Sequence, residues 1–126
     1  MSKLNDALIS QVMQAYVDNI SAGDLEAVIA LFSEDAVVED PVGSEPIRSH
    51  QALREFYGVA CESVSKMVLE GNVRACGSWG ACSMLASPKG VEDTLVIETL
   101  DVMQFNDAGK ITSMNAYWGD SNMRAL

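Results

Sequence analysis

The segment from Leu95 to Phe105 alternates with the period of a strand and carries a carboxylate on its apolar face. Alternate side chains of a strand point to the same face. The face that holds Asp101 also holds Leu95, Ile97, Thr99, Met103 and Phe105. A carboxylate that is removed from water costs several kcal/mol or takes up a proton. Asp101 is therefore either a neutral acid that donates a hydrogen bond in an apolar pocket, or a rim residue that is paired with an arginine.

Helical patterns come before the strands in this chain. Apolar residues at three-and-four spacing predict a helix from Leu8 to Ile20, and Gly23 can end it. Asp24 can cap a second helix that runs through Phe32, and Ser49 can cap a third. Strands are expected over residues 36–40, 66–74, 79–86, 95–105 and 110–118. This order predicts an α+β fold in which an antiparallel sheet curls around the helices.

The composition limits the classes of partner. A chain of 126 residues is expected to form a single domain over residues 1–126. Its formal charge of -10 argues against nucleic acid and anionic membranes as partners, because both require a basic surface. We find no apolar signal core and no run near the roughly 20 apolar residues of a membrane span.

The cysteines indicate the compartment. Cys61, Cys76 and Cys82 are odd in number and lack Cys-x-x-Cys spacing, so a disulfide framework and a zinc site are both poor interpretations. Free thiols in a reducing cytoplasm are expected instead.

The last two strands predict a wall that could bind a ligand. If Phe105 faces Lys110 across a four-residue turn, Asp101 faces Met114, and opposed residues share one face. The predicted wall consists of Asp101, Met103, Met114, Ala116 and Trp118, and Met84 is a further candidate contact. An apolar wall of this kind suits a flat hydrophobic ligand, although core packing also explains its methionines and tryptophan. Core packing alone does not explain the aspartate.

Several segments together resemble the bacterial ketosteroid isomerases. They are Gly23–Ala27, Asp35–Pro46, Phe56–Tyr57, Asp101–Phe105 and Ala116–Trp118, in order along nearly the whole chain. The resemblance implies a cone-shaped barrel of the nuclear transport factor 2-like, or cystatin-like, kind. In such a barrel three N-terminal helices pack in a strongly curved, mainly antiparallel sheet, and the protein is usually a homodimer.

The resemblance also implies a reaction, in which the double bond of a 3-oxosteroid moves from the Δ5 to the Δ4 position. Asp40 matches the general base, Tyr16 and Asp101 match the two oxyanion donors, and Tyr57 matches a tyrosine that hydrogen-bonds the first donor. Proton removal beside a ketone leaves charge on the carbonyl oxygen, so donors aimed at that oxygen lower the barrier. These isomerases are themselves the standard example of an acid kept neutral so that it can donate. No cofactor or metal is required.

Other functions remain open. Phe32 stands where some members have a third tyrosine, and the stretch Met84–Lys89 lacks the aromatic residues of many relatives. Related barrels include polyketide cyclases and epoxide hydrolases, and the latter normally use an Asp-Arg-Asp arrangement. The arginines here fall on expected loop, helix-surface or terminal positions, at Arg48, Arg54, Arg74 and Arg124. A third possibility is a non-catalytic module that binds an apolar ligand.

Overall fold

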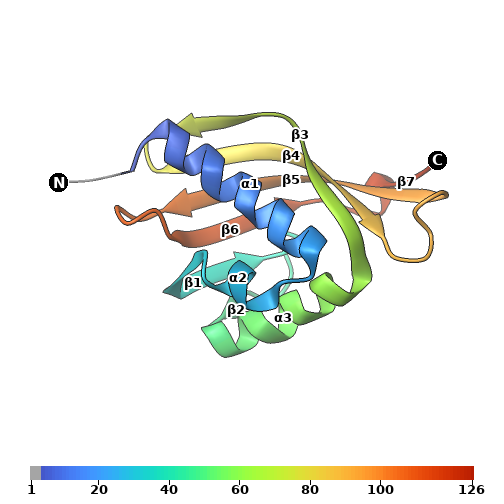
Figure 1. Ribbon diagram of the computed structural model, residues 1–126, viewed down its shortest axis with the longest axis horizontal. Coiled ribbons are helices and arrows are strands. Elements are labelled where there is room, and N and C mark those ends of the chain that lie inside the picture. Colours follow the sequence, from blue (N-terminus) through green and yellow to red (C-terminus); the bar gives the residue numbers. More distant parts are fainter. Residues whose placement is uncertain (1–3) are drawn as a thin grey trace.

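The computed structural model describes residues 4–126, in which three helices and the first two strands come before the other five strands. Figure 1 shows how these elements are arranged. The first three residues of the expected domain lie outside the described residues. The helices are α1 (Asp6–Ala22), α2 (Leu25–Ile29) and α3 (His50–Ser63). The strands are β1 (Phe32–Glu39), β2 (Ile47–Arg48), β3 (Val64–Cys76), β4 (Trp79–Pro88), β5 (Leu95–Phe105), β6 (Ile111–Tyr117) and β7 (Met123–Ala125), with a 3-10 turn η1 (Asp120–Asn122) before β7.

The ends of α1 follow local chemistry. The Asn5 side chain accepts a hydrogen bond from the Leu8 amide and so caps the first turn. Gly23 closes the helix in the left-handed conformation, with φ of 69°, and its amide donates to the Ile20 carbonyl. The predicted end of the first helix therefore agrees with the structure.

The second helix is shorter than the sequence pattern predicts. It ends at Ile29, and Phe32 already belongs to β1. The Ile111 amide donates to the Leu31 carbonyl, and Phe32 pairs with Ile111 of β6. Pairing with a strand about 80 residues away takes the backbone groups that a longer helix would use, and no local pattern reveals such a partner.

The seven strands form one mixed sheet in the order β2-β1-β6-β5-β4-β3, with β7 paired to β5. The pairing of β1 with β6 is parallel, whereas the other pairings are antiparallel. An α+β fold with a mainly antiparallel sheet is thus confirmed; the strongly curved cone stays a prediction. The short strands β2 and β7 were not predicted, since two or three residues carry no readable alternation.

The register between β5 and β6 differs from the predicted one. Asp101 faces Ala116 and Met103 faces Met114, two residues along from the expected partners. The ladder shifts between Gln104 and Phe105, where the Asn106 side chain accepts from the Ala108 and Lys110 amides and widens the turn. A shift of two residues keeps each side chain on its predicted face, whereas a shift of one would reverse it.

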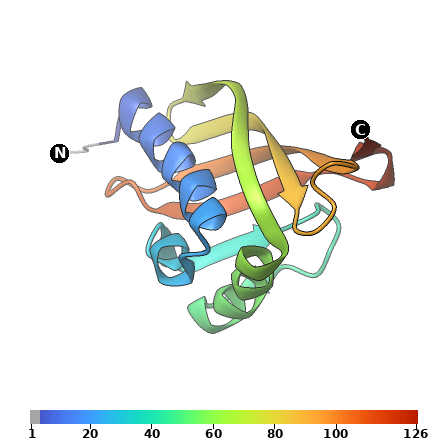
Figure 2. The same ribbon diagram turned by 45° about the vertical axis from the view of Figure 1, so that its right-hand side comes forward.

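Helix α1 lies across one face of the sheet, and α3 packs near the end formed by β1 and β2 (Figure 1, Figure 2). The buried face of α1 consists of Ile9, Met13, Tyr16, Val17 and Ile20. Gly80 of β4 permits this close approach, because a Cβ at that position would stand 2.6 Å from Cγ2 of Ile9. Within residues 4–126, the helices are all too short or too polar to cross a membrane.

Candidate active site

A pocket lies between α1, α3 and the sheet, and it holds about 500 Å³ of empty space, part of it open to solvent. Seven of its lining residues are apolar: Ile20, Phe56, Ala60, Val64, Met67, Ala86 and Ile97. The polar groups in its wall belong to Tyr16, Asp40, Tyr57, Thr99 and Trp118. The apolar residues come from both helices and from β3, β4 and β5, so the pocket exists only after the whole chain has folded.

Asp101 is buried beside this pocket, with 1% of its surface exposed. The hydroxyl of Thr99, which does line the pocket, donates to Oδ1 of Asp101 at 2.8 Å. Burial and, to a smaller extent, the negative charge of Asp40 raise the pKa of Asp101, the Thr99 hydrogen bond opposes the rise, and the net pKa is about 7. Asp101 is therefore protonated over most of the acidic range.

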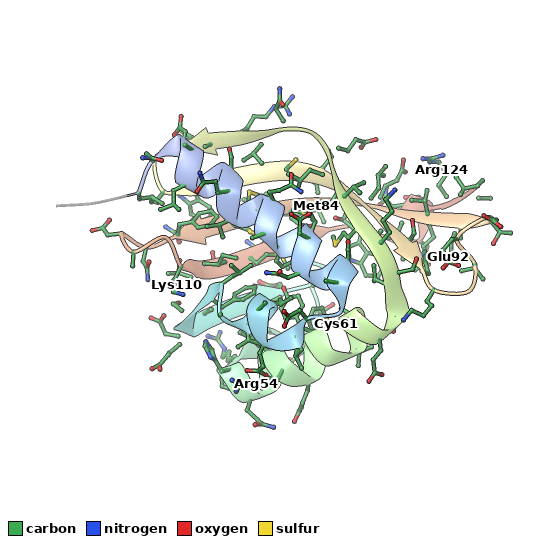
Figure 3. The ribbon with its side chains drawn as sticks, viewed as in Figure 1. Arg54, Cys61, Met84, Glu92, Lys110 and Arg124 are labelled. Atoms are coloured by element: carbon green, nitrogen blue, oxygen red, sulfur yellow. The ribbon has the colours of Figure 1, made fainter. Side chains whose placement is uncertain are left out.

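No arginine pairs with Asp101 in residues 4–126. Arg54 of α3 forms an ion pair with Glu26, and Arg124 of β7 forms one with Glu98. Both side chains lie at the outside of the molecule (Figure 3). The structure therefore contradicts the interpretation of Asp101 as a rim residue that is paired with an arginine.

Asp40 stands directly after β1, at the wall of the pocket. The indole Nε1 of Trp118 donates to its Oδ1 at 2.6 Å. Burial raises the pKa of Asp40, and the indole hydrogen bond opposes that rise by stabilising the carboxylate. Glu39, its neighbour, has a different role, because its carboxylate accepts from the Gly43 amide in the following loop.

Tyr16 and Tyr57 present two buried hydroxyls that lie 3.0 Å apart. Their rings meet edge to face, with centroids 5.8 Å apart. Burial raises the pKa of both phenols well above the usual value, so both remain protonated donors. The ring of Phe32 packs against both tyrosines and adds no hydroxyl, so the chain of hydroxyls ends at Tyr57.

The four polar residues that were predicted for the site, Tyr16, Asp40, Tyr57 and Asp101, lie close together in the structure. The predicted apolar contacts are divided between the pocket and the core. The charges of Asp40 and Asp101 both act on the Tyr16 phenol. Of the residues expected to contact a ligand, Trp118 lines the pocket. The other four are buried in the core: Met84, Met103, Met114 and Ala116. Figure 3 shows Met84 where α1 crosses the sheet, and contact of these four with a ligand stays a prediction.

Two functional contacts were missed from the sequence. Trp118 was expected only as an apolar wall, yet its indole N–H binds Asp40 across 78 positions of the chain. A buried indole needs an acceptor, and this rule could have prompted a search for one. Thr99 was placed on the face of Asp101 but was given no role, although neighbours on one strand face readily exchange hydrogen bonds.

Chemically, the site combines one carboxylate that retains a stabilising donor with three protonated donors around an apolar space. Such a set can accept a proton from carbon and hold negative charge on oxygen. Within residues 4–126, no group of three or more histidine, cysteine or acidic side chains could hold a metal ion.

Residues 13–114 match the model of the SnoaL-like domain, which is about four-fifths of the chain. The chain belongs to the SnoaL-like family. Over 118 residues, the SnoaL-like protein is 36% identical to a steroid Delta-isomerase of Nocardioides simplex, covering 93% of this chain and 94% of that one. The expected resemblance to the bacterial steroid isomerases is thus confirmed.

Two further relatives are enzymes of another kind. A stretch of 43 residues is 42% identical to the epoxide hydrolase LasB of Streptomyces lasalocidi, covering 34% of this chain and 15% of that protein. The solved structure of SalBIII, an epoxide hydrolase/cyclase-like enzyme with a role in pyran ring formation in the polyether salinomycin, superposes with a TM-score of 0.86. That match has 26% identity and covers 97% of this chain and 98% of the other. The fold is therefore shared by enzymes with different reactions.

Proposed function

We propose that the SnoaL-like protein is a steroid Δ-isomerase, which converts 3-oxo-Δ5-steroids to 3-oxo-Δ4-steroids. The observation that carries the proposal is the pair of carboxyl groups with unequal surroundings beside one apolar pocket. Asp40 has the Trp118 indole as a donor and partial access to water, whereas Asp101 is almost fully buried. The similarity to the Nocardioides simplex isomerase over nearly the whole chain supports the same assignment.

The two carboxyl groups lose their protons in a fixed order. Asp40 ionises first, and its charge then makes the ionisation of Asp101 harder. Between these two steps the site holds one carboxylate base and one neutral acid. Asp40 removes a proton from the carbon between the ketone and the double bond, which leaves a dienolate. It then returns the proton to the far carbon of the former double bond, so that the ketone re-forms with a conjugated double bond and no net proton is gained or lost.

Negative charge develops on the substrate oxygen while Asp40 holds the proton. Tyr16, supported by the Tyr57 hydroxyl, and neutral Asp101 donate to that oxygen. The donors are buried and held by packing, so they need little reorganisation as the charge forms. No redox step occurs, and the reaction needs no cofactor.

The wall of the pocket indicates the shape of the substrate. Its polar groups make three hydrogen-bonded pairs, Tyr16–Tyr57, Trp118–Asp40 and Thr99–Asp101, of which the last reaches behind the wall to the buried acid. The rest of the wall is apolar. A fitting ligand has one oxygen at the reacting end and a hydrophobic body, as a 3-oxosteroid has.

An epoxide hydrolase or cyclase is the second candidate, and the superposition with SalBIII favours it. An Asp-Arg-Asp site requires an arginine between the two acids. Arg54 and Arg124 instead form ion pairs with surface glutamates, which argues against this reaction. A non-catalytic ligand-binding role would leave the paired carboxyl groups without a function.

The test is incubation of the purified protein with 5-androstene-3,17-dione while the absorbance of the conjugated enone is followed. We expect turnover, with loss of activity on the alkaline side near the Asp101 pKa of about 7. No rise above buffer at micromolar protein would remove the proposed activity. Tight binding of equilenin without turnover would favour the ligand-binding alternative, and ring opening of an epoxide would favour the hydrolase.

Two wider properties belong to the same proposal. We infer a homodimer and a cone-shaped barrel from the resemblance to the isomerases. The outer sheet face carries exposed Leu100 and Tyr117, which are direct partners on β5 and β6. A cytoplasmic location fits the three free cysteines.

A further inference from the structure

We propose that Thr99 is a positioning residue that holds Oδ1 of Asp101 as an acceptor, so that the single proton of the neutral acid sits on Oδ2 and is free to be donated. This inference rests on the proposed function and deepens it. It assigns a role to a hydroxyl that the base and the two oxyanion donors do not account for.

Thr99 is in the right place for this role. Thr99 and Asp101 lie two residues apart on β5, so their side chains share the inner face. The hydroxyl-to-carboxyl distance is 2.8 Å, and the hydroxyl is the donor. Thr99 also lines the pocket, whereas Asp101 is 1% exposed. Thr99 therefore borders the open pocket on one side and contacts the buried carboxyl group on the other.

A neutral carboxylic acid can carry its proton on either oxygen, and only one arrangement is useful. If both oxygens were free, the proton could face the core and the acid would offer an acceptor to the developing oxyanion. A hydroxyl that donates to Oδ1 makes that oxygen an acceptor, because an oxygen that carries the acid proton is a much poorer one. The Thr99 hydrogen bond thus selects the proton position before the substrate arrives, which is electrostatic preorganisation.

The other neighbours of Asp101 cannot substitute for Thr99. The titratable groups that act on or near it are Asp40 after β1, Tyr16 of α1, Tyr57 of α3 and Cys82 of β4. Burial raises the pKa of both phenols and of the thiol, so Asp40 is the one charged group near neutral pH. On β6 the facing residue is Ala116, which has no polar side chain.

The Thr99 hydrogen bond also has a measurable effect on the pKa of Asp101. A donor to Oδ1 also stabilises the carboxylate, so the Thr99 hydrogen bond lowers the pKa of Asp101 against the effect of burial. Removing the hydroxyl should therefore raise the pKa of Asp101 and extend its neutral form to higher pH. At the same time the acid should donate less well, because its proton is no longer held on one oxygen. A purely structural threonine would produce neither effect.

The experiment compares Thr99→Val, which replaces the hydroxyl by a methyl group of similar size, with Thr99→Ser, which keeps the hydroxyl. The first readout is carbon-13 NMR of protein labelled at the aspartate side-chain carboxyl carbon, with Asp101→Asn to assign the signal. We expect the Asp101 titration midpoint to move upward in the Val variant and to stay at the wild-type position in the Ser variant. Thr99→Ala gives the same comparison if Val disturbs the packing.

The second readout is activity and ligand binding across pH. In the Val variant we expect kcat at acidic pH to fall about fivefold, the usual size for one neutral hydrogen bond, while the alkaline limb moves upward. The Ser variant should match the wild type in both respects. Affinity for equilenin, whose phenol accepts from the same donors, should fall in parallel.

Several outcomes would overturn the inference. An unchanged Asp101 titration in the Val variant would show that the hydrogen bond has no influence. A rise in kcat would show that Asp101 donates to Thr99, so that the threonine competes with the substrate. Failure of Ser to restore the wild-type behaviour would assign the effect to packing of the methyl group. If the wild type shows no isomerase turnover, the proposed function fails, while the NMR titration still decides the Thr99 contact.

Discussion

At the scale of single residues, the site depends on two aspartates that differ only in their surroundings. Asp40 keeps a donor from Trp118 and borders the pocket, whereas Asp101 has one hydroxyl partner and is buried. Because desolvation penalises a charged group, the more deeply buried acid retains its proton to higher pH. The base and the acid of the proposed reaction are thus the same residue type in two environments.

Asp40→Asn removes the proton acceptor with almost no change in volume. We expect kcat to fall by several orders of magnitude with a small change in KM, since binding depends on the apolar wall. Steady-state kinetics on the 5-ene ketone would check this, with Glu39→Gln as the matched control because the Glu39 carboxylate binds the Gly43 amide. Wild-type kcat in the Asn variant would move the base elsewhere.

Asp101→Leu removes a donor and leaves an apolar side chain on an apolar face. The expected loss in kcat is about 10²–10³-fold, the usual size for one oxyanion contact, whereas Asp101→Asn should lose less because it keeps a donor. Both variants should remain folded, as judged by circular dichroism. A fully active Leu variant would contradict the role of Asp101 as a donor.

At the scale of secondary-structure elements, the start of α3 holds a strained residue. Ser49 has φ of 79° and ψ of 150°, a region that glycine occupies far more readily, while its hydroxyl caps the helix at the Ala52 amide. Strain of this kind costs about 1–3 kcal/mol, and replacing a serine cap by glycine costs only a few tenths.

Ser49→Gly should therefore stabilise the protein by roughly 1 kcal/mol, measured as the free energy of unfolding in urea. Ser49→Ala is the control, because alanine keeps the strain and loses the cap. It should be destabilising by about 1 kcal/mol. Equal stabilities for the two variants would show that neither strain nor capping matters at this position.

The contact between α1 and β4 depends on the absence of a side chain at Gly80. A Cβ there would stand 2.6 Å from Ile9 and 2.9 Å from the sulfur of Met13, so the helix would have to move. Gly80→Ala should destabilise by about 1–3 kcal/mol in urea unfolding, as overpacking usually does. Gly119→Ala is the control, because a Cβ there meets nothing within 4 Å and the change should be close to neutral.

At the scale of the whole molecule, the buried acids make stability depend on pH. The pKa of Asp101 rises from an unfolded value of 3.8 to about 7 in the folded protein. A raised pKa means that the folded state binds the proton more tightly. The associated stability is fully present below the unfolded pKa and is lost as the pH rises through about 7. Burial raises the pKa of Asp40 as well, and that contribution has the same sign.

As the pH rises from about 4 to about 8, the wild type should lose stability that the Asp101→Leu variant keeps. The free energy of unfolding of the variant should therefore increase relative to that of the wild type over this range. At the acid end both proteins carry a neutral side chain at this position, and the difference should be small. Urea unfolding at a series of pH values, with Asp40→Asn measured beside it, would check the trend. A Leu variant that is less stable by a constant amount would indicate lost packing.

Local patterns in the sequence determined much of the architecture. Helix α1 and its glycine end, the cap of α3, and the alternation of β5 all follow from contacts within a few residues, so they are readable in order along the chain. The inward face of Asp101 follows as well, since a register error of two residues does not change the face.

Contacts between distant segments were decided only by the tertiary structure. The parallel pairing of β1 with β6 shortened α2 and brought the end of β1 beside the end of β6. That pairing places the Trp118 indole on Asp40, and no spacing in the sequence encodes it. The burial of Met84, Met103 and Met114 in the core likewise became visible only in the folded structure. Apolar patterns specify which face is buried, whereas the element that covers it depends on how the whole chain packs.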